Sequence, residues 1–325
     1  ERTNQTVSSV VLKDANAEKA EGTVKKRAED LAVAISKEMG APIEMSRSSQ
    51  VTSGTWHLDG FLRAARDFQW EHPLGDWAPG ERILHQPIGV CALITPWNWP
   101  MNQIVLKVAP AMLAGCTMVL KPSEIAPLSG LIFAEIVDAA GIPPGVFNLV
   151  NGDGAGVGSQ LSAHPDVDMV SFTGSTRAGI AISKAAADTL KRVSLELGGK
   201  DALIVLDDAD LDKAVNAATF GTFMHQGQIC MSVERIIVHK AVAEEFTRRL
   251  VANVETLKVG NPASMDCVIG PLINTRQLEN VHGQVTEAIK KGATLLTGGK
   301  FSGLFYEPTV LSGVTREMKI FGDET

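Results

Sequence analysis

The residues best suited to covalent chemistry are a cysteine and a glutamate that each stand beside glycines. Cys230 ends the run Gly227-Gln228-Ile229-Cys230, and Glu196 opens the run Glu196-Leu197-Gly198-Gly199. A thiolate is a strong nucleophile, and neighbouring glycines let backbone N–H groups approach a reacting atom. A nearby carboxylate can accept the thiol proton or activate a water against a covalent intermediate. Taken singly, each residue also fits an ordinary role, since a free cysteine is often a small buried hydrophobe.

An asparagine supplies a third chemical group. Asn98 lies in Pro96-Trp97-Asn98-Trp99-Pro100, between aromatics and prolines at the end of an apolar run. Its side-chain N–H₂ can donate to an oxyanion that develops on a carbonyl under attack. The three groups together favour covalent catalysis at Cys230 over three unrelated structural roles.

Three further segments stand where strands are expected to end. Phe172-Thr173-Gly174-Ser175 closes a strand and opens a helix, so its backbone and the Ser175 hydroxyl can hold a pyrophosphate. The glycine run at 152–158 is only a loose relative of the dinucleotide fingerprint and is equally typical of a loop-to-helix turn. Lys121 and Glu124 follow another strand, where such a pair can bond ribose hydroxyls or simply face solvent.

The apolar pattern predicts an α/β fold with a doubly wound parallel sheet, because strands alternate with helical stretches. In such a sheet the ligand binds at the carboxyl ends of the strands. The strands are expected at 90–95, 117–120, 146–150, 169–172, 192–196 and 202–205. The helices are expected at 23–39, 57–68, 130–140 and 210–224, the last capped by the Asp207-Asp208 region, and 70–80 is expected to be a loop.

Composition excludes several classes of protein. The 325 residues are 45% hydrophobic, which suffices for about two domains with a large core. The net charge of −7, without long blocks of one sign, argues against nucleic acid or an anionic membrane as partner. The apolar run at 88–120 is broken by Pro96, Pro100 and Pro110, which favours a strand, a turn and a helix over a membrane span.

Cysteine usage and the opening residues indicate a compartment. The four cysteines, Cys91, Cys116, Cys230 and Cys267, lack CxxC pairing, which argues against a metal site and against a disulfide framework. Residues 1–21 are polar and lack the apolar core of a secretory signal. We therefore expect a reducing, cytoplasmic location and no bound metal.

In type and order, the motifs closely resemble the aldehyde dehydrogenase superfamily. The resemblance covers about residues 25 to 325. Besides the segments around Asn98, Glu196 and Cys230, it rests on Lys121-Pro122-Ser123-Glu124, on Phe172-Thr173-Gly174-Ser175-Thr176 followed by Gly179, and on Ile320-Phe321-Gly322-Asp323-Glu324.

This resemblance implies a reaction. The Cys230 thiolate adds to an aldehyde, and the Asn98 amide and the Cys230 backbone N–H hold the oxyanion. The thiohemiacetal delivers hydride to a nicotinamide and leaves a thioester, which Glu196-activated water hydrolyses to a carboxylic acid. Lys107 matches a family position tied to proton relay, although a lysine on a helix face is an equally ordinary feature.

The resemblance also implies a cofactor, NAD, with NADP not excluded. Lys121 and Glu124 would hold the adenine ribose, and Glu124 would repel a 2′-phosphate. Ser175 would meet the pyrophosphate, and Glu324 would reach the nicotinamide ribose. The remaining members of the predicted cofactor set line the same path or lie within the same motifs: Ile94, Thr95, Pro96, Trp97, Ser123, Gly154, Gly158, Phe172, Thr173, Gly174, Leu197 and Gly198.

The resulting prediction is an NAD-dependent aldehyde dehydrogenase with a Rossmann-like cofactor domain at 1–68 and 88–198, a connecting and oligomerisation arm at 69–87, and a partial catalytic domain at 199–325. Family members are commonly longer and form homodimers or homotetramers. The apolar residues around the motifs, Trp99, Met101, Met224, Ile229 and Met231, suggest an apolar substrate channel.

Three alternatives stay open. A CoA-acylating relative would intercept the thioester with a thiol, although such enzymes usually lack the base that Glu196 supplies. A thiol esterase or transferase would need no nicotinamide. A truncated, non-catalytic scaffold would keep the fold without a complete site.

Overall fold

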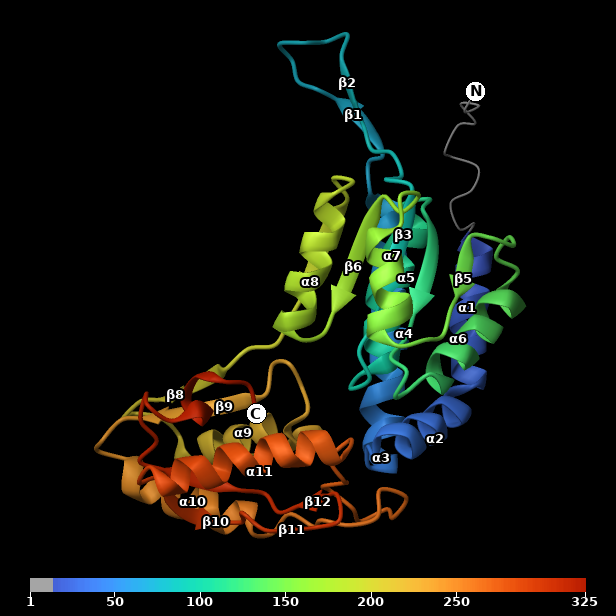
Figure 1. The fold of residues 1–325 in the computed structure, drawn as a ribbon. Coiled ribbons are helices and arrows are strands. Elements are labelled where there is room, and N and C mark those ends of the chain that lie inside the picture. Colours follow the sequence, from blue (N-terminus) through green and yellow to red (C-terminus); the bar gives the residue numbers. More distant parts are fainter. Residues whose placement is uncertain (1–13) are drawn as a thin grey trace. The chain divides into compact units, whose positions relative to one another are not determined.

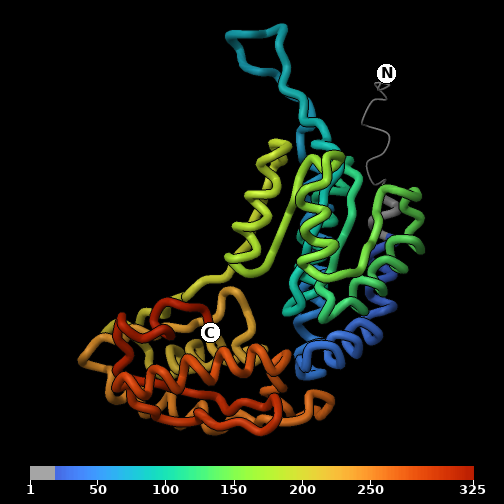
Figure 2. Tube along the Cα trace, viewed as in Figure 1, coloured from blue at the N-terminus to red at the C-terminus, as the bar shows by residue number. Residues whose placement is uncertain are grey.

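The computed structural model describes residues 14–325, which form two compact units. One unit contains the described residues up to Ala34 together with Arg47–Glu196, and the other contains Ile35–Ser46 together with Leu197–Thr325. The chain crosses between them within helix α2 (Ala28–Met39), after Ser46, and between Glu196 and Leu197. Figures 1 and 2 follow the chain through both units.

The first unit is built on a five-stranded parallel sheet with the order β5-β4-β3-β6-β7. This confirms the predicted doubly wound α/β sheet, and β7 has the predicted bounds. Strand β3 is central. The chain adds β4 and β5 on one side of it and then β6 and β7 on the other side, so the strand order reverses between β3 and β6. The strands are β3 (Val90–Ile94), β4 (Thr117–Lys121), β5 (Phe147–Leu149), β6 (Met169–Thr173) and β7 (Arg192–Glu196).

Helices connect these strands. Since crossovers between parallel strands are right-handed, the helices that lead toward β5 lie on the opposite face from those that lead toward β7. On the face that carries the helices leading toward β5, α5 packs against α4 and α6, and α1 also packs against α4 and α6. On the other face, α7 packs against α8. Their bounds are α1 (Asp14–Lys26), α4 (Val51–Asp67), α5 (Pro100–Leu113), α6 (Leu128–Ala140), α7 (Ser159–Ala163) and α8 (Thr176–Ala187), with π-helical turns η2 (Ser46–Gln50) and η3 (Gly154–Gly158).

Two predictions for the first 80 residues are wrong. The helix expected at 23–39 is divided at Arg27 into α1 and α2, although backbone hydrogen bonds from Arg27 to Thr23 and from Leu31 to Arg27 continue across the break. The expected loop at 70–80 contains a strand of a hairpin, β1 (Glu71–Pro73) paired with β2 (Arg82–Leu84). Strands of three residues with exposed ends leave no apolar alternation to detect. Within its unit this hairpin extends away from the sheet (Figure 1).

The described residues of the second unit form three two-stranded sheets and several helices. β8 (Asp201–Val205) pairs in parallel with β9 (Val233–Val238), and β10 (Thr294–Thr297) pairs with β13 (Val310–Ser312). A short hairpin joins β11 (Phe301–Ser302) to β12 (Phe305–Tyr306). The helices are α3 (Ile43–Met45), α9 (Leu211–Phe223), α10 (Ala243–Val254), α11 (Thr275–Lys290) and α12 (Lys319–Gly322), with the turn η4 (Met224–Gly227) after α9.

Asp210, the residue before the first residue of α9, caps this helix. The expected cap at Asp207-Asp208 is wrong: the Asp210 carboxylate accepts the backbone N–H groups of Asp212 and Lys213, at 3.1 and 3.2 Å. Three aspartates within four residues offer the same capping chemistry, so the sequence alone did not distinguish them. Asp210 also bonds Lys213, and together these contacts lower the pKa of its carboxyl group.

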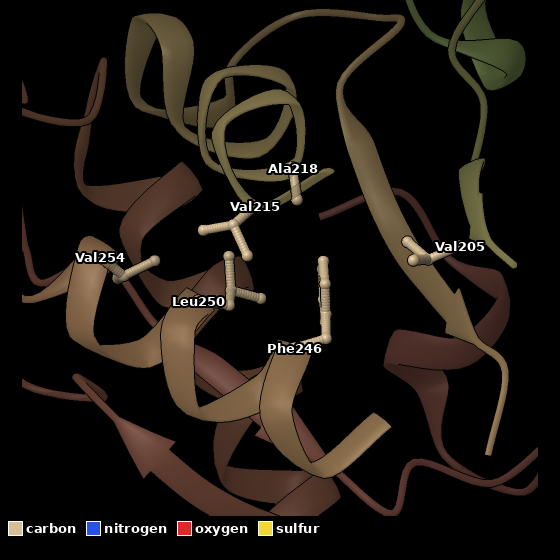
Figure 3. Packing of buried hydrophobic residues seen from close by; sticks show 6 residues of the cluster. All are labelled: Val205, Val215, Ala218, Phe246, Leu250 and Val254. Atoms are coloured by element: carbon tan, nitrogen blue, oxygen red, sulfur yellow. The ribbon is translucent and has the colours of Figure 1, made fainter. Parts of the chain in front are cut away.

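Helices α9 and α10 pack around a buried aromatic ring. Phe246 is fully buried between the two helices and strand β8 (Figure 3). The amphipathic pattern of α10 places Phe246, Leu250 and Val254 on one face, one turn apart. The buried members of this cluster are Val205, Val215, Ala218, Phe246, Leu250 and Val254.

Replacing Phe246 by alanine tests this core. We expect Phe246→Ala to lower the free energy of unfolding of the second unit by about 3–5 kcal/mol, because a buried ring leaves a cavity. Urea unfolding followed by circular dichroism measures the loss. Tryptophan fluorescence reports separately on the first unit, which contains all five tryptophans. Phe220, on α9 and 65% exposed, is the matched control; equal losses in Phe246→Ala and Phe220→Ala would contradict this assignment of the core.

Candidate active site

The carboxyl ends of the parallel strands bring most of the predicted site residues to one edge of the first unit. Thr95 follows β3, and its backbone N–H donates to Lys121 O at the end of β4, at 3.1 Å. Gly174 follows β6, and its N–H donates to Glu196 O at the end of β7, at 3.0 Å. The residues that follow β3, β4 and β6 therefore lie at the carboxyl ends of the strands together with Glu196, as a parallel sheet requires.

Lys121 is not the solvated partner of a surface pair. Its side chain is 2% exposed, and Nζ donates to Pro122 O at 2.9 Å and lies 3.3 Å from the Glu124 carboxylate, which is half exposed. A Cβ at Gly158 would lie 3.7 Å from Lys121 Cε, so the glycine turn borders the same lysine. Ser123 uses its hydroxyl to accept the N–H of Ile125. This edge presents a buried cation beside an accessible carboxylate.

Two glycine segments lead into helices. The turn η3 opens α7, and Asp153 caps it by accepting the Gly156 N–H at 2.6 Å, so the structure has the loop-to-helix turn that the sequence left open. Gly174 is required where it stands, because a Cβ there would lie 2.5 Å from the Phe172 ring. The Ser175 hydroxyl caps α8 by accepting the Ala178 N–H at 3.3 Å.

Buried hydroxyls at the strand reversal fit a polar ligand. Thr95 directly follows β3 and Thr173 ends β6, the two strands between which the order reverses. Each side chain is at most 5% exposed, and within residues 14–325 neither hydroxyl has a hydrogen-bond partner. A buried hydroxyl without a partner is costly, so a ligand that bonds both would stabilise this edge. Ribose and phosphate oxygens of a dinucleotide have the chemistry that these groups need.

Asn98 is held by a residue that the sequence did not indicate. The Gln50 side-chain amide donates to the Asn98 backbone carbonyl at 3.0 Å. Gln50 is fully buried at the end of η2, and its contact lies 48 positions along the chain. A fully buried glutamine is uncommon because its amide must be satisfied inside the protein. No motif or periodicity in the sequence indicates this contact.

A buried lysine of α5 contacts strand β6. Lys107, on α5, is 7% exposed, and its Nζ donates to Ser171 Oγ on β6 at 3.0 Å. Burial lowers the pKa of Lys107 from 10.5 to about 8, and the negative charge of Glu196 opposes that shift. Lys107 is therefore not a lysine on a solvated helix face, and it is in electrostatic contact with the predicted base. No motif in the sequence indicates Ser171 as its partner.

The pH dependence of stability tests the environment of Lys107. Between pH 8 and 10.5 the unfolded chain binds more protons at this lysine than the folded chain, so the free energy of unfolding rises with pH across that window. We expect a rise on the order of 2 kcal/mol in the parent that Lys107→Met lacks. Urea unfolding followed by tryptophan fluorescence measures it. Lys184→Met, at an exposed position of α8, should keep the rise; a parental rise in Lys107→Met would show that Lys107 is not its source.

The predicted nucleophile belongs to the second unit. Cys230 follows η4 and is partly exposed, whereas Cys91, Cys116 and Cys267 are buried. A Cβ at Gly199 would lie 3.7 Å from Cys230 O, so the glycine segment after Glu196 borders the nucleophile's backbone. Of the cysteines, Cys230 is thus the one that a reagent can reach.

Glu324 meets Gly198 in the same unit. A Cβ at Gly198 would overlap the Glu324 carboxylate, so these two predicted cofactor residues, 126 positions apart, are direct neighbours. Burial raises the pKa of Glu324, Glu234 adds to the rise, and Lys200 opposes it. Lys200 and Glu234 form a buried ion pair that also binds Thr325 through the Lys200 Nζ donor and a Glu234 acceptor.

The predicted site is divided between the units. Asn98, Lys107 and Glu196 lie in the first, with the residues that follow β3, β4 and β6, while Cys230, Leu197, Gly198 and Glu324 lie in the second. Met101, expected to line a substrate channel, is instead fully buried against Gly54 of α4. Met231 is 72% exposed.

The second unit contains a cavity of about 610 Å³ lined mainly by apolar residues of β9, α10 and β13. Cys230 is not among its lining residues. Residues 14–325 contain no cluster of His, Cys, Asp and Glu that could hold a metal ion. In the same range, each helix is too short or too polar to span a bilayer.

Comparison with known families gives one match over almost the whole chain. Residues 10–325 match the model of the aldehyde dehydrogenase family. A 3-succinoylsemialdehyde-pyridine dehydrogenase from Pseudomonas sp. is 48% identical over 306 residues, which cover 91% of this chain and 63% of that protein. The peroxisomal aminoaldehyde dehydrogenase 2 of Pisum sativum is 47% identical over 247 residues, covering 74% of this chain and 49% of that protein.

Solved structures show the same fold. An aldehyde dehydrogenase from Bartonella henselae has a TM-score of 0.93 and 44% identity, with 98% of this chain and 69% of that chain covered. Aldehyde dehydrogenase C from Pseudomonas syringae, solved as a variant with NAD⁺ and octanal, has a TM-score of 0.92 and 43% identity, with 96% and 64% covered.

Proposed function

Because this chain belongs to the aldehyde dehydrogenase family, we propose that it oxidises an aldehyde to a carboxylic acid with NAD as the electron acceptor. The chain spans 63% of the length of the Pseudomonas relative. The observation that carries the proposal is the sheet edge that gathers Thr95, Lys121 and Thr173, with two buried hydroxyls that have no partner among the described residues.

The residues divide the covalent work. The Cys230 thiolate bonds the aldehyde carbon, and the Asn98 amide and the Cys230 backbone N–H hold the oxyanion of the thiohemiacetal. NAD, when bound, would accept a hydride, which carries two electrons and one proton. Cys230 then retains the acyl group as a thioester, and Glu196 takes a proton from the water that attacks it. Gln50 supports the oxyanion donor by holding the Asn98 peptide.

Lys107 is placed to serve Glu196. A lysine whose pKa is about 8 can release and recover a proton near neutral pH, which a solvated lysine does rarely. We propose that Lys107 exchanges the proton that Glu196 takes from water, with Ser171 holding its amine.

The cofactor residues lie at the strand ends. Lys121 and Glu124 would bond the adenine ribose, and the backbone of Gly174 and Ser175 would approach the pyrophosphate. Ile94, Pro96 and Trp97 would line the path, and Glu324, beside Gly198, would reach the nicotinamide ribose. These assignments make 1–68 and 88–198 the cofactor domain and 199–325 the catalytic domain.

The substrate class, assembly and compartment belong to the same proposal. The octanal bound by the Pseudomonas syringae enzyme and the name of the Pseudomonas relative both support an aldehyde with an apolar body. The hairpin β1–β2, in which Trp77 is 79% exposed at the tip, is a suitable arm for a homodimer or homotetramer. The widely spaced cysteines, which lack CxxC pairing, suit a reducing compartment such as the cytoplasm.

Paired variants test the chemistry. We expect Cys230→Ala to lose aldehyde-dependent NADH formation by more than about 10³-fold, because no other group can form the thioester. Glu196→Gln should give one equivalent of NADH per enzyme and then nearly stop, since the thioester forms but is not hydrolysed. Stopped-flow absorbance of NADH distinguishes the two patterns.

Cys267→Ala, at a buried thiol outside the site, is the control and should keep parental turnover. Full turnover in Cys230→Ala would disprove the assignment of the nucleophile. Recovery of Glu196→Gln by added coenzyme A to rates above the parent would favour a CoA-acylating enzyme. If the parent binds NAD but forms no NADH when aldehyde is added, the result would favour the truncated, non-catalytic scaffold.

Glu124 tests the choice of cofactor. Its carboxylate is half exposed near Lys121, so it should repel a 2′-phosphate by about 1 kcal/mol, or roughly fivefold in affinity. We expect Glu124→Gln to narrow the preference for NAD over NADP by that factor, as measured by quenching of tryptophan fluorescence on titration. Glu81→Gln, in the exposed hairpin, should leave the ratio unchanged. An unchanged ratio in Glu124→Gln would assign the preference to another residue.

A further inference from the structure

The backbone adopts the left-handed conformation, with positive φ, at consecutive residues shortly before the predicted nucleophile. His225, Gln226 and Gly227 have consecutive positive φ values of 53°, 58° and 73°. Glycine adopts this conformation easily, but a residue with a Cβ does so only when its surroundings hold it. Among residues 14–325, only Leu190 is a further non-glycine residue with positive φ. Two such residues in succession, four and five positions before Cys230, call for a structural cause.

The Gln226 side chain provides one. Its amide nitrogen donates to the Gly40 carbonyl at 3.0 Å and to the Pro271 carbonyl at 3.1 Å. Both amide hydrogens are thereby used, one toward each carbonyl. We call this arrangement the amide clasp: the Gln226 amide with the carbonyls of Gly40 and Pro271. All three residues belong to the second unit, although they lie 186 and 45 positions apart in the chain.

Glycines make room for the amide clasp. A Cβ at Gly270 would overlap the Gly40 carbonyl and lie 2.7 Å from the Gln226 amide nitrogen. A Cβ at Gly40, whose φ is +73°, would lie 2.5 Å from Pro271 Cγ. The backbones therefore approach closely enough for one short amide to reach both carbonyls only because neither glycine carries a side chain.

Further hydrogen bonds connect the residues that follow the amide clasp to the residues on either side of Cys230. The Gly227 carbonyl accepts the Ile229 N–H at 2.9 Å and the Ser232 hydroxyl at 2.9 Å. The Gln228 side-chain oxygen accepts the Ile273 N–H at 3.0 Å, two residues after Pro271. Cys230 thus lies between two residues, Gly227 and Ser232, that are bonded to each other. These hydrogen bonds would transmit a displacement of Gln226 to Cys230.

We propose that Gln226 is a positioning residue for Cys230, because the amide clasp holds the left-handed turn that sets where the thiol lies. The importance of that position for catalysis rests on the proposed function; the link from the clasp to the thiol does not. Gln226 touches no reacting atom, and it acts through Gly227 and the turn. A misplacement of about 1 Å at a nucleophile costs on the order of 100-fold in turnover.

Substitution by methionine tests the clasp, since methionine has nearly the shape of glutamine but cannot donate. In intact Gln226→Met we measure the rate at which iodoacetamide alkylates Cys230, following the Cys230 peptide by mass spectrometry, without aldehyde or NAD. We expect this rate to change at least tenfold from the parent. If the protein turns over aldehyde, kcat should fall on the order of 10- to 100-fold with little change in KM for NAD.

The matched control is Gln284→Met. Gln284 is also buried in the second unit, and its amide donates to Glu324 O at 3.0 Å, away from the turn. Its substitution should lower the melting temperature to a similar extent while leaving Cys230 alkylation at the parental rate. Parental alkylation in Gln226→Met, or an equal change in Gln284→Met, would overturn the proposal. Turnover retained by Cys230→Ala would instead disprove the proposed function and leave the alkylation result to judge the clasp.

Gly270→Ala provides an independent route to the same point. It keeps the glutamine but places a methyl group against the Gly40 carbonyl and the Gln226 amide. In the fraction that folds, as judged by circular dichroism, Cys230 alkylation should change in the same direction as in Gln226→Met. A change in the opposite direction, or none, would count against the amide clasp as the cause.

Discussion

Parallel pairing of β3 with β4 on one side and with β6 on the other is the constraint on which the first unit depends. A parallel partner is reached only through a crossover, so every strand ends at the same edge and every helix starts there. The reversal of strand order between β3 and β6 turns the helices to opposite faces, which leaves the edge between them open to a ligand. Thr95 and Thr173 stand at that reversal.

Buried glutamines then fix the loops that the sheet and helices leave loose. Gln50 holds the Asn98 peptide, Gln226 holds the turn before Cys230, and Gln284 holds the Glu324 carbonyl. A glutamine can donate to a carbonyl inside a protein without burying a charge, which would cost several kcal/mol more. The same side-chain chemistry thus supports three predicted site segments, although none of the glutamines carries a catalytic function itself.

Sequence patterns sufficed where one residue type has one structural meaning. Apolar runs located β3, β4, β6 and β7 to within one residue at each end. Patterns failed where several residues offer the same chemistry, as at the cap of α9, or where a contact depends on distant chain segments. Gln50 and Ser171 have no periodicity or motif, and only the folded chain shows what they bind.

The boundary between the two units falls directly after the predicted base. Glu196 ends the first unit, and Gly199, three residues later, borders the Cys230 carbonyl in the second. Gly198 also accommodates Glu324 within this linker. A side chain at Gly198 would displace the Glu324 carboxylate, whereas a Cβ at Gly199 would lie 3.3 Å from the Asp201 carboxylate and 3.7 Å from Cys230 O. Close packing therefore bears on Gly198 more than on Gly199.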